Sequence, residues 1–114
     1  MQNNKVNWFK VALSIDEIQW QSNNMTVIEV DGKKVTIAKF KDELFVFAYK
    51  CPHAGGVMAE GFIDALGNAV CPLHRYKFNL KTRRNFTGED YLKTYFVEIK
   101  EDGVFVGFEE KKWF

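Results

Sequence analysis

Cysteine, histidine and proline are each present in only two copies among the 114 residues of this sequence. An excess of charge of one sign is also lacking. The 16 Lys and Arg against 15 Asp and Glu leave a net charge of +1, which gives no electrostatic reason to expect nucleic acid or an anionic membrane as a partner. No apolar run approaches the roughly 20 residues of a membrane span, and the N-terminus has none of signal-peptide length. We therefore expect a soluble, cytoplasmic protein that binds neither nucleic acid nor membrane.

The abundant residues are apolar and aromatic. Hydrophobic residues make up 46% of the chain and aromatic residues 16%, with Phe alone at 11 copies, which is typical of a β-rich globular protein. A chain of this length can build one hydrophobic core without disulfides. Because no repeat, linker or low-complexity tract divides the chain, we predict a single domain over residues 1–114.

Short apolar runs separated by turn residues predict antiparallel strands. Asp31-Gly32 readily supplies the positive φ angles of a tight hairpin turn, and Glu101-Asp102-Gly103 repeats the signal. Helix has little room beyond a short turn over residues 15–19. The expected fold class is therefore all-β, a small antiparallel sandwich or barrel. Strands are predicted at residues 27–30, 35–40, 44–49, 95–100 and 104–108.

Both cysteines and both histidines lie within residues 51–74, in two similar units. The first unit is Cys51-Pro52-His53 and the second is Cys71-Pro72-Leu73-His74. A short hairpin around Leu66-Gly67 is predicted between them and would fold the two units back toward each other, and a strand over residues 76–80 follows the second unit. Each unit thus places one thiol and one imidazole within a turn of each other.

Three interpretations of these units compete. A single buried thiol or histidine is commonly an ordinary core or surface residue, but chance is a poor account of four of them in two matching units. Two thiolates and two imidazoles could fill the tetrahedron of a structural zinc site, although zinc fingers usually pair Cys with Cys and His with His. The third interpretation is a Rieske-type iron–sulfur cluster, in which two histidines replace two cysteines on one iron.

The spacing Cys-x-His, seventeen residues, Cys-x-x-His, in the form CPHAGG and CPLH, resembles that of the Rieske ferredoxin family. The resemblance extends from about Phe9 to Phe108. It implies one [2Fe-2S] cluster per chain, and a Rieske-like β-sandwich or barrel with a cluster-binding subdomain of two loops, about residues 50–80, at one end. The implied ligands of the cluster are Cys51, His53, Cys71 and His74.

Residues beside the implied ligands bear on the same site. Gly55 and Gly56 would let the main chain approach the cluster without a Cβ in the way, and Gly61 stands where the family usually keeps a glycine. Val57, Met58 and Leu73 are expected to surround the exposed imidazoles with apolar surface.

Two positions set this chain apart within the family. Arg75 stands where relatives usually have glycine after the second histidine, which predicts either a strained positive φ or a different path of the loop. Phe78 stands where the respiratory branch has a hydroxyl donor to the cluster. The missing hydroxyl implies a reduction potential in the lower part of the roughly −150 to +300 mV Rieske range.

The resemblance implies an electron carrier, because both histidines are committed to the cluster and none is left to bind a catalytic iron. No residue is needed as acid, base or nucleophile, so the chain is not expected to be an enzyme by itself. The implied donor is a flavin-dependent reductase, and the acceptor is an oxygenase or another oxidoreductase. Two alternatives stay open, which are the small subunit of a nitrite reductase-like complex and a zinc-stabilised binding module.

Overall fold

The computed structural model describes residues 4–52, 55–73, 75–82 and 92–111. Within these ranges the chain forms antiparallel strands and two single-turn 3-10 helices, η1 (Ile15–Glu17) and η2 (Met58–Glu60). Six strands form a curled sheet in the order β1-β9-β8-β4-β3-β2, and three form a second sheet, β5-β6-β7. The strands are β1 Asn4–Ala12, β2 Met25–Val30, β3 Lys33–Phe40, β4 Glu43–Ala48, β5 Phe62–Ile63, β6 Asn68–Val70, β7 Lys77–Asn79, β8 Thr94–Lys100 and β9 Gly103–Lys111. The predicted all-β antiparallel class is confirmed.

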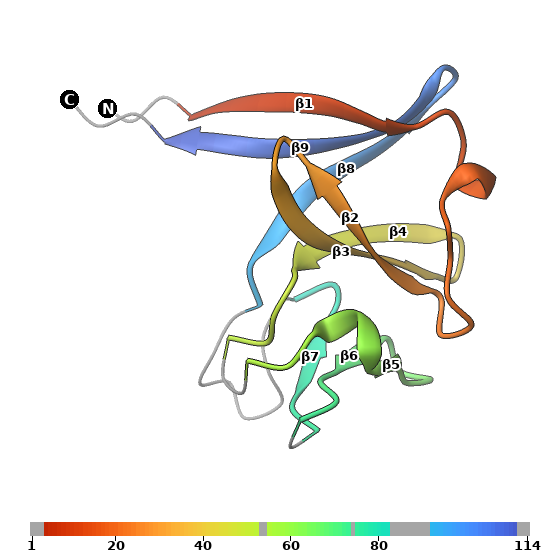
Figure 1. The fold of residues 1–114 in the computed structure, drawn as a ribbon, viewed down its shortest axis with the longest axis vertical. Helices are drawn as coiled ribbons and strands as arrows, with labels where there is room; N and C mark the ends of the chain where they lie inside the picture. Colours follow the sequence, from red (N-terminus) through yellow and green to blue (C-terminus); the bar gives the residue numbers. More distant parts are fainter. Residues whose placement is uncertain (1–3, 53–54, 74, 83–91, 112–114) are drawn as a thin grey trace.

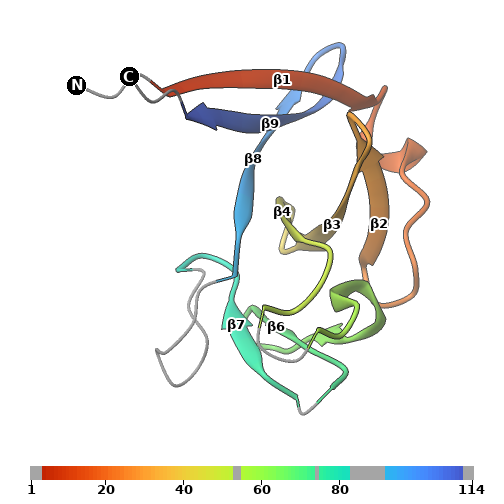
Figure 2. The same ribbon diagram turned by 60° about the vertical axis from the view of Figure 1, so that its left-hand side comes forward.

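The two sheets lie at different ends of the molecule. Figures 1 and 2 show β1 and β9 paired along one end and the β5-β6-β7 sheet with η2 at the other, while β2, β3 and β4 lie between them. No helix among the described residues is long and apolar enough to cross a membrane.

The predicted hairpins form because their turns supply the required backbone angles. Asp31 and Gly32 have φ of 50° and 78°, the two positive angles of a primed turn, and Val30 pairs with Lys33 across it. The turn at Glu101-Asp102 joins β8 to β9, with Lys100 paired to Gly103 across it, but neither turn residue has a positive φ; only Gly103, with a φ of 154°, does. Strand β1 is absent from the sequence predictions, because its partner β9 lies about a hundred residues away and no local turn marks the pairing.

Two hydrophobic clusters are formed by buried residues of the described ranges. One lies within the six-stranded sheet and is built around Val35, Ile37, Val46, Val104 and Val106, all nearly inaccessible to solvent. The other lies under the segments that carry the cysteines, and it joins Met25 and Phe47 of the larger sheet to Met58, Phe78 and both cysteines. Burying a side chain the size of Phe47 or Phe78 stabilises the fold by about 2 to 3 kcal/mol. The cysteine segments are therefore anchored to the larger sheet by apolar packing.

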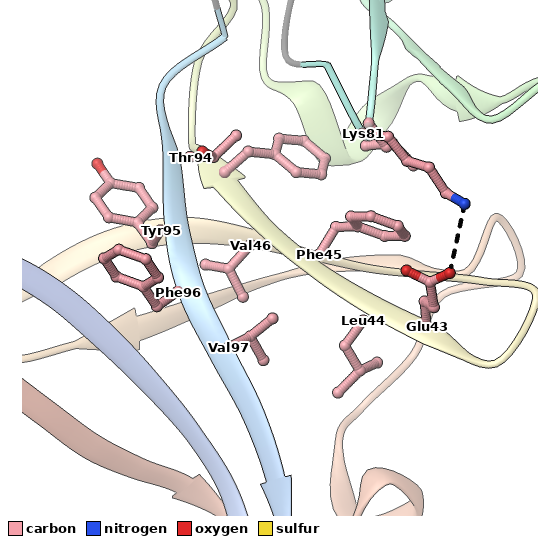
Figure 3. Close-up of a pocket in the computed structure, with 11 residues that line it drawn as sticks. Glu43, Leu44, Phe45, Val46, Lys81, Thr94, Tyr95, Phe96 and Val97 are labelled. Carbon is pink, nitrogen blue, oxygen red and sulfur yellow. Dashed lines mark ion pairs between the residues drawn. The ribbon is translucent and has the colours of Figure 1, made fainter.

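A cavity of about 410 Å³ opens where β4 and β8 diverge (Figure 3). The two strands pair only at Val46 with Tyr95 and at Phe47 with Thr94. Beyond these pairs, apolar side chains line the gap, and an ion pair of 3.6 Å between Lys81 and Glu43 crosses its rim. The lining includes neither cysteine, so this cavity is separate from the predicted cluster site.

Candidate metal centre

The first cysteine loop, residues 51–56, is closed by its own backbone hydrogen bonds. The N–H of Cys51 donates to the carbonyl of Gly56 at 2.8 Å, and the N–H of Gly55 donates to the carbonyl of Cys51 at 2.9 Å. Lys50 and Val57, one residue outside the loop on each side, form an antiparallel bridge. Gly55 has a φ of 74°, so the loop turns through the left-handed region at that residue.

The second cysteine loop, residues 71–76, repeats this backbone frame between β6 and β7. The N–H of Cys71 donates to the carbonyl five residues later, that of Tyr76, at 2.8 Å, which is the same offset as in the first loop. Val70 and Lys77 pair one residue outside it. Each loop therefore has six residues, starts at a cysteine and closes at the same two positions.

Arg75 holds the left-handed position of the second loop. Its φ is 55°, four residues after Cys71, as Gly55 lies four residues after Cys51. Of the two outcomes predicted for Arg75, the structure shows the strained positive φ, which costs about 1 kcal/mol relative to glycine. The side chain is exposed, and no described carboxylate forms an ion pair with it.

The two cysteine thiols are free, buried and adjacent. Cys51 is 2% exposed and Cys71 0%. Burial raises the pKa of the Cys71 thiol, the backbone N–H of Leu73 lowers it, and the neighbouring Cys51 thiol raises it. The net direction is upward, so the thiol stays protonated at neutral pH unless a cation neutralises it, as a bound metal does. The N–H groups of Leu73 and Gly56 are already directed at Cys71, where they would stabilise a thiolate.

Gly56 brings the first loop against the sulfur of the second. A Cβ on Gly56 would lie 3.0 Å from Cys71 Sγ and 3.0 Å from Leu73 Cγ, tighter than ordinary van der Waals contact. This close approach matches the predicted role of the glycine. Gly55 acts differently, because a Cβ there would meet nothing within 4 Å and its positive φ alone favours glycine. Two buried thiols, two directed N–H groups and a backbone without a Cβ fit the thiolate side of an iron–sulfur cluster.

The two predicted histidine ligands, His53 and His74, lie outside the described residues, so their roles stay predictions. Among the described residues, no group of three or more His, Cys, Asp or Glu side chains comes together to hold a metal ion. Of the four predicted ligands, the described residues include Cys51 and Cys71, and the structure brings these two together.

The predicted apolar surroundings of the imidazoles are correct only in part. Leu73 is 48% exposed and Val57 is half-buried, so both are available at the surface. Met58 is 0% exposed and belongs to the core beneath the cysteine loops, so its predicted place at the surface is wrong. The reason is that η2 turns Met58 inward against the larger sheet.

Two amide side chains that no sequence motif marks fix the segment after the first loop. Asn23 Nδ2 donates to the carbonyls of Ala59 and Gly61 at 2.8 and 2.9 Å, and its Oδ1 accepts the N–H of Met25 at 3.1 Å. Gln21 Nε2 also donates to the Ala59 carbonyl, at 2.9 Å. These bonds join the chain before β2 to η2. No local pattern could have revealed them, because the partners are 36 to 38 residues apart.

Asn23→Asp is expected to lower the free energy of unfolding by about 2 kcal/mol, because it keeps the acceptor for Met25 but replaces the donor facing two carbonyls with an oxygen. Urea unfolding checks the value. The matched control is Ser22→Ala at the exposed neighbouring position, which should change stability by less than about 0.5 kcal/mol. Equal effects of the two substitutions would show that the amide does not fix η2.

Asp64 closes the turn between β5 and β6 beside the second loop. Its Oδ1 accepts the N–H groups of Leu66 and Asn68, each at 3.0 Å, and its Oδ2 accepts Asn68 Nδ2 at 3.0 Å. Lys77, which flanks the second loop, lies 3.7 Å away in an ion pair. Burial raises the pKa of this carboxyl, but the bonds from Asn68 and Leu66 and the charge of Lys77 outweigh it, so the pKa lies below its ordinary value of 3.8.

Asp64→Asn is expected to lower stability by about 1 to 2 kcal/mol at pH 7, because it removes charge-assisted hydrogen bonds. A depressed pKa stabilises the fold above the unfolded value of 3.8, and this contribution is lost as the pH falls through the folded value. The difference between native and variant in urea unfolding should therefore shrink below about pH 4. A difference that stays constant down to pH 3 would contradict the assignment. Asp31→Asn, which removes the same charge from an exposed turn, should change stability at pH 7 by less than about 0.5 kcal/mol.

Comparison with known proteins agrees with this arrangement. The 3-phenylpropionate/cinnamic acid dioxygenase ferredoxin subunit of Photorhabdus laumondii is 26% identical over 80 residues, which cover 68% of this chain and 76% of that protein. The ferredoxin of carbazole 1,9a-dioxygenase from Nocardioides aromaticivorans has a TM-score of 0.72 at 24% identity, covering 87% of this chain and 95% of its own. A protein assigned as the NADH-dependent nitrite reductase small subunit of Mycobacterium tuberculosis has a TM-score of 0.77 at 16% identity, covering 91% and 96%. The two structural likenesses show a shared fold.

The Rieske [2Fe-2S] domain matches residues 7–95, a span that includes both cysteine loops and all four predicted ligands. The family resemblance of the sequence is thereby confirmed, and with it the identity of the cofactor. The chain belongs to the Rieske [2Fe-2S] domain family and carries a single [2Fe-2S] cluster.

Proposed function

We propose that this protein is a soluble, cytoplasmic ferredoxin that carries single electrons from a reductase to an oxygenase or another oxidoreductase. The observation that carries the proposal is the pair of equivalent cysteine loops, whose adjacent buried thiols lie at one end of a fold shared with dioxygenase ferredoxins. The chain acts as one component of a redox system, and no residue is assigned a catalytic role. Residues 1–114 form one domain, with the cluster-binding subdomain at about residues 50–80.

The proposed cluster ligands are Cys51, His53, Cys71 and His74. When bound, a [2Fe-2S] cluster supplies reversible one-electron transfer. The protein holds the two thiolates out of water, directs N–H groups at Cys71, and stiffens both loops with Pro52 and Pro72. Phe78 is fully buried and has no hydroxyl to donate to a sulfur, which supports a potential in the lower part of the Rieske range.

Similar proteins support an oxygenase as the acceptor. The relative from Photorhabdus is a ferredoxin subunit of a dioxygenase, and a solved complex of oxygenase and ferredoxin in carbazole 1,9a-dioxygenase contains a chain of this fold. The donor in such a system would be a flavin-dependent reductase. The structural likeness to a nitrite reductase small subunit keeps that role as the second candidate. The family match favours iron and sulfide over the zinc-stabilised binding module.

Spectroscopy of the purified protein tests this proposal. Protein prepared without oxygen should be reddish-brown, contain two irons and two acid-labile sulfides per chain, and give the low average g-value of a Rieske centre when reduced. It should then accept electrons from NADH through a flavin reductase and pass them to a Rieske-type oxygenase. Colourless protein with one zinc would contradict the proposal, and a cluster that neither reduces nor reoxidises would contradict the carrier role.

A further inference from the structure

We propose that Arg75 is a docking residue that directs the cluster end of this protein to a carboxylate-bearing surface on its redox partner. The inference rests on the proposed function and adds the chemistry of the partner's surface to it. The starting observation is that Arg75, in the second cysteine loop, is exposed and has a left-handed backbone conformation.

The left-handed backbone conformation at this position of the loops does not require an arginine. The equivalent residue of the first loop is Gly55, with a φ of 74°, where glycine meets the conformational demand without strain. A Cβ at Gly55 would meet nothing within 4 Å, and Arg75 at the equivalent position of the second loop is exposed. Arg75 thus carries a backbone strain that glycine would remove, and its exposed side chain makes no ion pair with any described residue. A strained residue with an exposed side chain points to a role outside the fold.

The charges of the two loops are all of one sign. The segments 50–57 and 71–77 contain Lys50, Arg75 and Lys77 but no Asp or Glu. Asp64 neutralises Lys77 by an ion pair of 3.7 Å, which leaves Lys50 and Arg75 as exposed cations beside the cysteines. The nearest carboxylate along the chain after the first loop is that of Glu60, in η2.

Among the described residues of the same two loops, three exposed ones carry apolar side chains. Leu73 is 48% exposed, and Pro52 and Pro72 are exposed as well. Exposed apolar and cationic side chains in the same two loops have the make-up of a protein docking surface. The complementary partner is a protein that surrounds its own electron entry point with Asp and Glu side chains. Arginine suits this contact because its planar guanidinium can donate two parallel hydrogen bonds to one carboxylate.

Electron transfer to small charged oxidants tests the inference without an identified partner. Dithionite-reduced protein is mixed with ferricyanide, a trivalent anion, or with hexaammineruthenium(III), a trivalent cation. In each case one electron passes from the cluster to the metal of the oxidant. At about 10 mM ionic strength, Arg75→Gln should slow oxidation by ferricyanide and speed oxidation by hexaammineruthenium, each roughly threefold to eightfold. At about 1 M salt both differences should vanish, because the Debye length falls to about 3 Å.

Matched variants separate charge from other effects. Arg75→Lys keeps the charge and should keep the native rates, while Arg75→Gly removes both charge and strain and should behave like Arg75→Gln. Lys5→Gln makes the same charge change on β1, at the opposite end from the β5-β6-β7 sheet (Figure 1), and should leave both rates unchanged. Polyglutamate, a carboxylate-rich probe, should slow the oxidation of native protein by ferricyanide more than that of Arg75→Gln, whereas polylysine should not.

The outcomes that overturn the inference differ from those that overturn the proposed function. A cluster-loaded protein whose Arg75→Gln rates equal those of Lys5→Gln at low salt would overturn the docking role and leave the electron carrier intact. Protein that binds no reducible cluster would overturn the proposed function, and the inference with it.

Discussion

Gly61→Ala is expected to destabilise the protein by about 3 kcal/mol or more and to prevent stable cluster binding. A Cβ at Gly61 would overlap the carbonyl oxygen of Val70 and approach Pro72 Cδ to 3.3 Å, so it would push apart the segments that lead into the second loop. The φ of Gly61 is −86°, so the effect is steric and not a matter of left-handed backbone. Urea unfolding and iron content per chain measure it.

Gly32→Ala is the matched control for this prediction. Gly32 has a φ of 78° in the β2–β3 turn, but a Cβ there would meet nothing within 4 Å. Its cost is therefore about 1 kcal/mol of backbone strain, with the cluster retained. If Gly61→Ala costs no more than Gly32→Ala, the close approach of Gly61 to Val70 is not a requirement of the fold.

Cys71→Ala is expected to reduce bound iron from two atoms per chain to nearly none and to abolish the visible absorption of the cluster. The thiolate of Cys71 has no substitute nearby, because the only other cysteine in the chain is Cys51. The substitution removes a single sulfur from the core, so the strands should persist, as checked by far-ultraviolet circular dichroism.

A control for packing accompanies this variant. Val70→Ala deletes two buried methyl groups from the residue next to Cys71, at a cost of about 1 to 3 kcal/mol, but it removes no proposed ligand. It should retain two irons. Iron that persists in Cys71→Ala, or that is lost equally from Val70→Ala, would contradict the assignment of Cys71 as a ligand. His53→Ala and His74→Ala extend the same measurement to the two histidines.

The parts of this protein that sequence predicts well are those whose causes are local. Asp31-Gly32 specifies its own turn angles, and the alternating apolar residues beside it specify two strands, so the turn of that hairpin is correct and each predicted strand begins two residues late. The two cysteine units are equally local, because the residues that carry the resemblance to the Rieske ferredoxin family, and with it the implied cofactor, lie within them.

The parts that sequence missed depend on distant partners. The pairing of β1 with β9 and the hydrogen bond from Asn23 to the Ala59 carbonyl join residues far apart in the chain. No periodic pattern in the sequence indicates either of them. Met58 illustrates the same limit, because an apolar residue beside a cluster loop can face either solvent or core, and only the packing of η2 decides. For Arg75, the sequence defined the two possible backbone states, and the structure distinguishes them.

The shared frame of the two cysteine loops bears on the order of events in cofactor assembly. Each loop is closed by a hydrogen bond between residues only five positions apart, so it can form early and at little entropic cost. Each half of the thiolate side can therefore take its shape without the other. The closures that shape the two cysteine segments use main-chain groups alone and do not themselves require iron or sulfide.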